Sequence, residues 1–144
     1  MVEIVLDKTP VGPDYPPYVI AEIGHNHMGS TEECNRLFRM AESAGAYAVK
    51  LQKRDNAALY TKSFFDSPYN SESAYGPTYG THRDALELNF DQYRELQDEA
   101  ADLGLTFFAT PFDLPSVEFL ERLDVPFYKI ASAGIQNPLL LRAV

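Results

Sequence analysis

From Tyr18 onward the sequence alternates between short, almost continuous apolar runs and longer amphipathic stretches, and this alternation restricts the fold more than any other feature. An apolar run of this length, bounded by turn signals, is typical of a strand buried on both faces of a sheet. Strict alternation of such strands with helices implies a parallel sheet with right-handed crossovers. We therefore predict an α/β fold of the (β/α)8 TIM-barrel type, with only the first four β/α units present. The predicted strands are residues 18–24, 48–52, 105–110 and 127–132.

The intervening helices have recognisable beginnings and ends. Ser30 is predicted to begin the first helix, with Glu33 three residues later as in a capping box, and Gly45 ends it. A second helix is predicted from about Asp91 to Gly104. Shorter helices are predicted over residues 117–123 and 138–144.

Two parts of the chain differ in their patterns. Residues 1–17 hold a short apolar run and then a turn-rich stretch with Pro10, Gly12 and Pro13, so we expect an amino-terminal hairpin or cap. Residues 18–144 are expected to form the first half of the barrel. An open half would expose two sheet edges and an apolar face. We therefore expect a fragment of a longer protein, or a half-barrel that pairs with a second half or forms a homo-oligomer.

Composition limits the partners and the compartment. The net charge of −9 at pH 7 argues against a nucleic-acid or anionic-membrane surface, although a small anionic substrate needs only a few local cations. No apolar run approaches the roughly 20 residues that cross a bilayer, and the acidic amino terminus is unlike a signal peptide. Cys34 is the only cysteine, so no intrachain disulfide can form, and we expect a cytoplasmic protein.

Polar side chains gather at the carboxyl ends of the predicted strands, where parallel α/β folds bind their ligands. Lys50 and Lys129 lie inside otherwise apolar strands, and a buried lysine is costly without an anion beside it. Glu22 could neutralise one of them in an internal ion pair. Two lysines with one nearby carboxylate leave a cation to spare, which favours a phosphate or carboxylate ligand over a purely structural pair. Gln52 lies two residues after Lys50, so both point to the same side of the sheet.

The segment from Lys53 to Phe90 is long for a connection between a strand and a helix, which usually has about 2–6 residues. A segment of this kind over the carboxyl ends of the strands is a lid, a binding loop or a disordered insertion. Its aromatic residues and its His82–Arg83 pair favour an ordered lid or binding loop.

His25 and His27 lie two residues apart and could chelate a metal if the segment were extended, with Asp113 close enough to join them. The spacing matches no known metal signature, and histidines in a polar loop more often form hydrogen bonds, which is the interpretation we favour. Cys34 has no evident base beside it, so a nucleophilic role is not expected.

Five collinear motifs between Tyr18 and Ser132 resemble the N-acetylneuraminate (sialic acid) synthase family. The motifs are Ala21-Glu22-Ile23-Gly24 with Asn26, His27 and Gly29; Lys50-Leu51-Gln52; Tyr79-Gly80 with His82-Arg83; Thr110-Pro111-Phe112-Asp113; and Lys129-Ile130-Ala131-Ser132. One of these motifs would be weak evidence, but five in the same order are strong evidence.

The resemblance implies an enzyme that condenses phosphoenolpyruvate with an N-acylated amino sugar such as N-acetylmannosamine, giving a nine-carbon 2-keto acid and phosphate. Glu22 would be the catalytic acid or base at the reacting carbons. Gln52 would contact the sugar. The phosphate and carboxylate of phosphoenolpyruvate would be held by Lys50, Thr110, Lys129 and Ser132. Further loop contacts would come from Asn26, His27, Tyr79, His82, Arg83 and Asp113.

The chain departs from the family pattern in two respects. Ala133-Gly134 follows Ser132, where the family usually has Gly-Asp. The resemblance also implies a divalent metal, Mn2+ or Mg2+, whose ligands lie in the second half of the family's barrel, so no metal ligand is assigned in this chain. A non-catalytic module that binds phosphoenolpyruvate or a sugar phosphate is therefore a second hypothesis. The sequence does not choose among sugars of the neuraminic, pseudaminic and legionaminic types.

Overall fold

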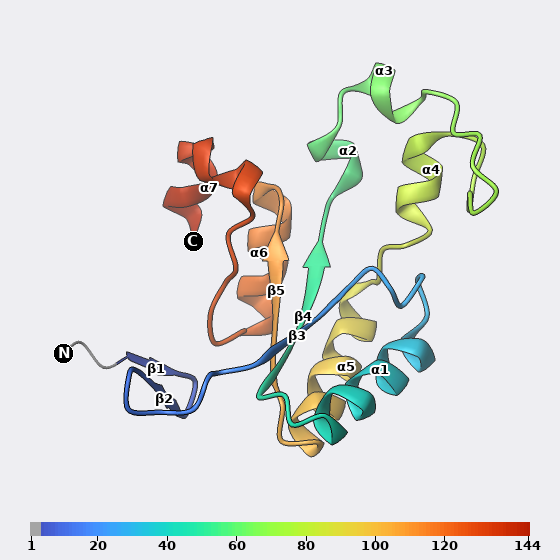
Figure 1. Ribbon diagram of the computed structural model, residues 1–144. Coiled ribbons are helices and arrows are strands. Elements are labelled where there is room, and N and C mark those ends of the chain that lie inside the picture. The colour runs from blue at the N-terminus through green and yellow to red at the C-terminus, as the bar shows by residue number, and fades with distance from the viewer. Residues whose placement is uncertain (1–3) are drawn as a thin grey trace.

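Residues 4–144 are described by the computed structural model, which builds a parallel sheet with helices packed along it (Figure 1). A hairpin of two short strands comes before the sheet, as the sequence predicts for the amino-terminal cap. The elements in chain order are β1 (Ile4–Leu6), β2 (Thr9–Val11), β3 (Ile20–Gly24), α1 (Thr31–Ser43), β4 (Ala48–Lys53), α2 (Asn56–Leu59), α3 (Lys62–Phe65), α4 (Tyr79–Asp84), α5 (Phe90–Asp102), β5 (Thr106–Pro111), α6 (Leu114–Leu123), the 3-10 helix η1 (Ser132–Gln136) and α7 (Pro138–Ala143).

The main sheet has the strand order β3-β4-β5, and all three strands are parallel. Helices α1, α5 and α6 form a row along it, each packed against the next (Figure 1). The aromatic rings of Phe38 on α1 and Tyr93 on α5 both contact Phe107 of β5, with ring centroids 6.1 and 5.9 Å apart. Because side chains alternate along a strand, the residues next to Phe107 point away from the helices. The helices therefore leave the opposite face of the sheet free for polar groups.

The predicted helix ends are confirmed in position. The Ser30 hydroxyl accepts a hydrogen bond from the Glu33 backbone N–H at 3.1 Å, and Gly45 follows α1 with a φ of 81°. The capping box itself is incomplete, because the Glu33 carboxylate binds Arg36 and the Ser30 N–H donates to the His27 carbonyl. At α5, by contrast, Asn89 and Gln92 form a complete capping box. The Ser30 backbone N–H is therefore held by the His27 carbonyl of the preceding loop and not by the Glu33 side chain.

The predicted fourth strand is not formed. Residues 127–131 have no strand pairing, and one long backbone bond, from Lys129 N–H to the Ala109 carbonyl at 3.4 Å, joins them to β5. The Phe127 ring packs on Phe108 at 4.5 Å, so side-chain contact rather than a hydrogen-bond ladder holds this segment beside β5. The chain then turns into η1, which a strand continuing to Ser132 would exclude. The described residues thus contain a parallel sheet of three strands, and the predicted half-barrel of four is not confirmed.

The predicted burial of the first strand on both faces is also wrong. Ile20 of β3 is 41% exposed, and Val19 before it is more exposed still. The reason is that β3 is an edge strand, paired on one side with β4 and on the other side with nothing in residues 4–144. None of the helices in this described part is long and apolar enough to cross a membrane.

Candidate active site

Four predicted site residues meet on the polar face of the sheet, and we call them the strand-end cluster: Glu22, Lys50, Gln52 and Thr110. Glu22 lies opposite Lys50 in the β3–β4 register, and Gln52 lies opposite Thr110 in the β4–β5 register. The Lys50 ammonium forms an ion pair with Glu22 Oε2 and donates to Thr110 Oγ1 at 3.2 Å. Gln52 Nε2 donates to Glu22 Oε1 at 3.3 Å. Three neighbouring strands therefore bring a cation, a carboxylate, an amide and a hydroxyl together.

The members of the strand-end cluster differ in exposure. The Lys50 side chain is only 9% exposed, whereas that of Glu22 is 49% exposed. Thr110 is buried. The internal ion pair that the sequence offered as one interpretation of Lys50 is thus present, but its carboxylate lies at the surface. A ligand can therefore approach the ammonium from the side where Glu22 stands.

In residues 4–144 the structure shows no hydrogen bond or ion pair that joins Lys129 or Ser132 to the strand-end cluster. Lys129 is exposed, and its ammonium donates to the neighbouring Ile130 carbonyl at 2.8 Å. Ser132 is also exposed, at the first position of η1. The expectation of a buried lysine in the fourth strand is therefore wrong, because the segment has no second strand beside it to cover the side chain. The binding roles of Lys129 and Ser132 remain predictions.

A second group of charged residues surrounds His25 after β3, and we call it the His25 cluster: His25, Lys53, Arg54, Arg83 and Glu87. His25 Nε2 lies 3.3 Å from Glu87 Oε1, and the Lys53 ammonium lies 2.8 Å from Glu87 Oε2. Burial alone would raise the pKa of Glu87, but the hydrogen bond from His25 and the Lys53 charge together lower it. Glu87 is therefore an ionised carboxylate held between two partners.

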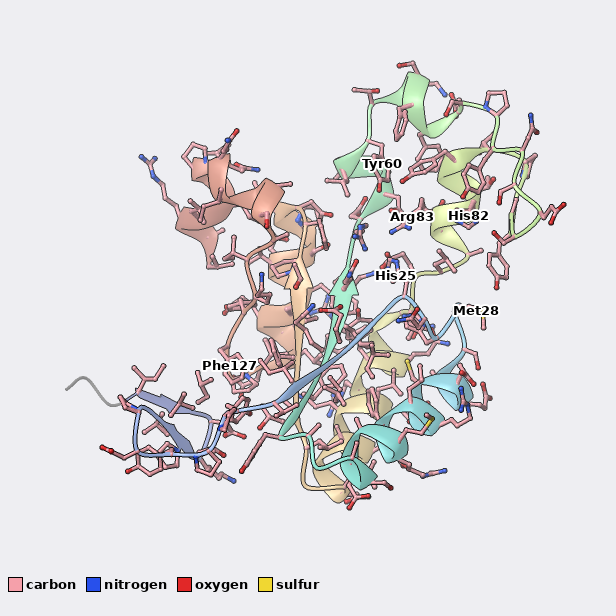
Figure 2. The ribbon with its side chains drawn as sticks, in the orientation of Figure 1. His25, Met28, Tyr60, His82, Arg83 and Phe127 are labelled. Atoms are coloured by element: carbon pink, nitrogen blue, oxygen red, sulfur yellow. The ribbon has the colours of Figure 1, made fainter. Side chains whose placement is uncertain are left out.

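Arg54 and Arg83 complete the His25 cluster. Arg83 Nη2 lies 3.0 Å from His25 Nδ1, and Arg54 Nη1 lies 3.5 Å from the same nitrogen. Arg54 Nη2 also donates to Gln52 Oε1 at 2.7 Å, which joins the His25 cluster to the strand-end cluster. Its guanidinium stacks on the Phe112 ring at 3.7 Å from the ring centroid. Figure 2 shows Arg83 on α4 and His25 after β3 close together near the end of β4.

The connection from Lys53 to Phe90, which we call the lid, is ordered, so the alternative of a disordered insertion is wrong. Its role as a lid or binding loop stays a prediction. The lid folds into α2, α3 and α4 (Figure 1). Tyr79 contacts other aromatic rings of the lid, and His82 stacks between Tyr69 and Tyr75 with ring centroids 4.4 and 5.8 Å away. The rings that contact Tyr79 are those of Tyr60, Phe64 and Tyr69. Tyr79 and His82 therefore build the lid, while Arg83 reaches out of it towards His25.

The remaining predicted loop contacts stabilise local turns. His27 is 2% exposed, and its Nδ1 accepts a hydrogen bond from the Gly29 N–H at 3.1 Å. Asn26 Nδ2 donates to the Ile23 carbonyl at 2.8 Å. Asp113 uses both carboxylate oxygens, one as the cap of α6 and the other for the Asp55 N–H at 2.9 Å. The favoured interpretation of the loop histidines as hydrogen-bonding groups is thus confirmed.

The described residues do not fit the divalent metal that the family resemblance implies. In residues 4–144 no three histidine, cysteine or acidic side chains gather closely enough to hold an ion. His25 and His27 use ring nitrogens for Arg83 and for Gly29, and burial, followed by the Glu33 charge, raises the pKa of the Cys34 thiol to about 12. No step is therefore assigned to a metal at these side chains.

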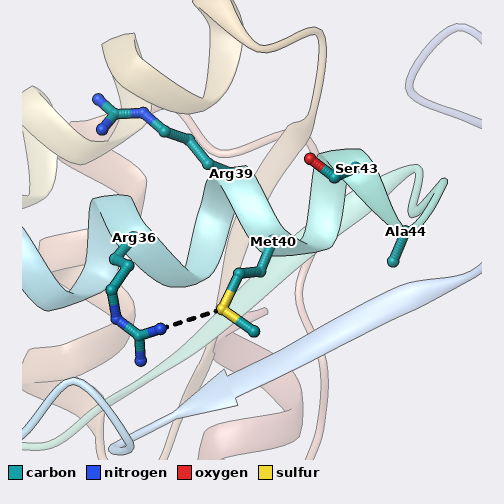
Figure 3. Close-up of a pocket in the computed structure, with 5 residues that line it drawn as sticks. All are labelled: Arg36, Arg39, Met40, Ser43 and Ala44. Atoms are coloured by element: carbon teal, nitrogen blue, oxygen red, sulfur yellow. Dashed lines mark hydrogen bonds between the residues drawn. The ribbon is translucent and has the colours of Figure 1, made fainter.

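A surface depression of about 540 Å³ lies elsewhere. Figure 3 shows it on the outer surface of α1, where Arg36 Nη1 lies 3.1 Å from Met40 Sδ. Arg36 and Arg39 are neutralised by Glu33 and Glu99. This depression is open and holds no unpaired charge, so it is not the candidate site.

Sequence reasoning missed Lys53, Arg54 and Glu87, all of which join the His25 cluster. The sequence did contain a signal for Arg54. It lies two residues after Gln52, so in an extended chain both side chains point to the same side. Glu87 gave no such signal, since it lies in the turn before α5 and meets Lys53 only in the folded chain.

Comparison with known proteins gives consistent results. The sequence profile of the NeuB family matches residues 37–144. N-acetylneuraminate-9-phosphate synthase of Homo sapiens is 42% identical over 127 residues, which are 88% of this chain and 35% of that protein. N,N'-diacetyllegionaminic acid synthase of Legionella pneumophila is 34% identical over 131 residues, 89% of this chain and 36% of that protein. The chain therefore spans about a third of the length of these curated relatives.

Solved structures show the same relationship. The crystal structure of N-acetylneuraminic acid (sialic acid) synthetase from Leptospira borgpetersenii, in complex with citrate, superposes with a TM-score of 0.75 at 31% identity, covering 99% of this chain and 45% of that one. Spore coat polysaccharide biosynthesis protein SpsE of Bacillus subtilis superposes with a TM-score of 0.76 at 28% identity, covering 99% of this chain and 37% of that one. With three quarters of its length matched by the family profile, the chain belongs to the NeuB family.

Proposed function

We propose that this chain supplies the phosphoenolpyruvate side of a sialic acid synthase-type active site. The reaction would join C3 of phosphoenolpyruvate to the aldehyde carbon of an N-acylated amino sugar such as N-acetylmannosamine. Water would add to C2 of phosphoenolpyruvate, and cleavage of the bond between C2 and the phosphate oxygen would then release phosphate and leave a nine-carbon 2-keto acid. Family membership supports this reaction class, and the relatives named above are synthases of such acids.

The strand-end cluster is the observation on which the proposal rests. The Lys50 ammonium, nearly buried and beside the Thr110 hydroxyl, is suited to hold an anionic group of phosphoenolpyruvate. Glu22 stands at the surface beside that cation and is the proposed acid or base at the reacting carbons. Groups fixed on paired strands need little rearrangement when charge develops on the departing phosphate.

We also propose that the three parallel strands are the beginning of a barrel that further strands complete. Apolar side chains are exposed along both lateral edges of the sheet. Val19, Ile20 and Met40 lie near the edge strand β3, and Ile135 and Leu139 lie beyond the edge strand β5. Exposed apolar surface of this kind favours association. The purified chain is therefore expected to form dimers or larger species in light scattering, and a well-behaved monomer would count against this part of the proposal. A cytoplasmic location is proposed with it.

The test of the reaction is titration with phosphoenolpyruvate, followed by an assay of phosphate release with N-acetylmannosamine and manganese. Glu22→Gln should abolish phosphate release without weakening phosphoenolpyruvate binding, because it removes the carboxylate that competes for Lys50. Glu42→Gln, at an exposed position of α1, is the matched control and should change neither quantity.

Each outcome of these measurements separates the hypotheses. Binding with turnover supports the synthase. Binding without turnover supports the second hypothesis, a non-catalytic module that binds phosphoenolpyruvate or a sugar phosphate. If the chain binds neither phosphoenolpyruvate nor a sugar phosphate, both hypotheses are wrong.

A further inference from the structure

Arg54 is hydrogen-bonded to a member of the strand-end cluster, yet the proposed chemistry gives it no role. Arg54 Nη2 donates to Gln52 Oε1 at 2.7 Å. At the other end of the same amide, Gln52 Nε2 donates to Glu22 Oε1 at 3.3 Å. Gln52 therefore links the guanidinium of Arg54 to the carboxylate that is proposed as the acid or base.

A guanidinium carries only hydrogen-bond donors, so it decides which end of the Gln52 amide faces it. The carbonyl oxygen must point to Arg54, and the NH2 group is then free to point to Glu22. Without a directional partner the amide could turn over and place its oxygen beside the Glu22 carboxylate, where two acceptors would repel each other. The hydrogen bond from Arg54 therefore excludes the orientation that would push Glu22 away.

The Arg54 guanidinium is itself held in place. One face lies on the Phe112 ring, 3.7 Å from the ring centroid. Its Nη1 lies against the His25 ring, whose Nδ1 is contacted by Arg83 of the lid at 3.0 Å (Figure 2). Among the polar contacts of the Arg54 N–H groups in residues 4–144, the one to Gln52 is the shortest. Arg54 therefore has a fixed position from which it can orient the Gln52 amide.

The backbone leaves room for this arrangement at Gly24. The β3–β4 register shifts between Glu22 and Gly24, and Gly24 has a φ of 59°, in the left-handed region that favours glycine. A Cβ at Gly24 would lie 3.2 Å from Glu22 Oε1 and 3.5 Å from Gln52 Nε2. A side chain at this position would therefore crowd the point at which the Gln52 amide meets the Glu22 carboxylate.

We propose that Arg54 is a positioning residue, which orients the Gln52 amide and so holds the Glu22 carboxylate beside Lys50. Lys50 pairs with Glu22 Oε2, so each carboxylate oxygen has its own partner and the Gln52 amide fixes the second one. This role rests on the proposed function, in which Glu22 acts at the reacting carbons. Because a reacting group displaced by about 1 Å can cost about 100-fold in rate, Arg54 should affect turnover and not the binding of phosphoenolpyruvate.

Nuclear magnetic resonance of the isotope-labelled protein tests the orientation without relying on turnover. In the wild type, the Gln52 side-chain NH2 should show a nuclear Overhauser effect to the Glu22 side chain. Arg54→Met keeps an apolar side chain on Phe112 but removes the donors, so it should abolish this effect. Arg54→Lys restores a group that only donates and should retain the effect in part. The side-chain amide of Gln92, in the capping box of α5, is the internal reference and should be unchanged in both variants.

The assay of phosphate release tests the consequence for the reaction. Arg54→Met should lower kcat about 10- to 100-fold and change the Kd of phosphoenolpyruvate by at most about twofold. In a Gln52→Ala background the same substitution should change kcat by less than about twofold, because the group that Arg54 orients is gone. Arg39→Met, at an exposed position of α1, is the matched control and should leave both quantities unchanged.

Three results would overturn the proposal. The first is a Gln52–Glu22 contact that persists in Arg54→Met. The second is a variant that loses affinity for phosphoenolpyruvate in place of turnover, which would make Arg54 a binding group. The third is an equal loss from Arg54→Met with and without Gln52, which would mean that Arg54 acts by another route. Failure of the proposed function is recognised separately, as a wild-type protein that shows the Gln52–Glu22 contact but releases no phosphate.

Discussion

β4 and residues 127–132 both resemble buried strands in the sequence, yet they differ in the fold and in what they offer a ligand. β4 is paired on both sides, and its Lys50 is held by a neighbour on each. Residues 127–132 are joined to β5 by one backbone hydrogen bond and by the packing of Phe127 on Phe108, and Lys129 is exposed. The comparison shows that an apolar run holds a charged side chain in a fixed, buried position when neighbouring strands pair with both of its edges.

The largest expected effect is on stability. Leu51 of β4 is completely buried, so Leu51→Ala should lower the free energy of unfolding by about 2–5 kcal/mol. Ile130 is only partly buried in the unpaired segment, so Ile130→Ala should cost about 1 kcal/mol or less. Urea unfolding of both variants measures the difference. Equal losses would mean that residues 127–132 are packed as firmly as β4.

Lowering the pH should destabilise the protein through His27, in the loop that follows β3. Burial, and then the His25 charge, lower the pKa of His27 to about 4, so the folded protein keeps this ring neutral where the unfolded chain protonates it. Stability is therefore complete above the unfolded pKa of about 6.5 and is lost as the pH falls towards 4, by about 3 kcal/mol in all. Unfolding free energies of the wild type and of His27→Gln between pH 7 and 4 measure this contribution. An identical pH dependence in both would contradict it.

The sequence predicted the fold where local signals were sufficient. The three strands of the sheet, the cap at Ser30 and the helix ends at Gly45 and Gly104 all depend on residues close in the chain. Pairing of residues 127–132 depends instead on a partner strand, which composition cannot reveal. Periodicity finds strands, but it does not count their neighbours.

The candidate site likewise has one part that the local sequence pattern predicts and one part that only the fold brings together. Glu22, Lys50 and Thr110 come together because strand register places them on one face, and alternation predicts that face. Arg83 and Glu87 reach His25 through the fold of the lid. Contacts of that kind join residues about 60 positions apart and leave no local pattern in the sequence.

Binding of phosphoenolpyruvate should show the next largest effect. Lys50→Ala removes a cation fixed between two strands and should raise the Kd at least about tenfold, which corresponds to about 1.4 kcal/mol. Lys8→Ala, in the hairpin turn at the other end of the molecule, is the matched control and should change nothing (Figure 1). Calorimetric titration supplies both values. An unchanged affinity in Lys50→Ala would remove the strand-end cluster as an anion site.

The smallest effect is expected for Lys129→Ala. An exposed ammonium contributes about 0.2–1 kcal/mol to an ionic contact, so the Kd for phosphoenolpyruvate should rise by no more than about fivefold. Measurements at higher salt distinguish the two lysines, because mobile ions screen exposed charges more than buried ones. Raising the ionic strength to about 0.5 M should therefore abolish the difference between Lys129→Ala and wild type while leaving most of the loss caused by Lys50→Ala. A loss in Lys129→Ala that matches Lys50→Ala and resists salt would show that residues 127–132 become as well ordered as β4 when the ligand binds.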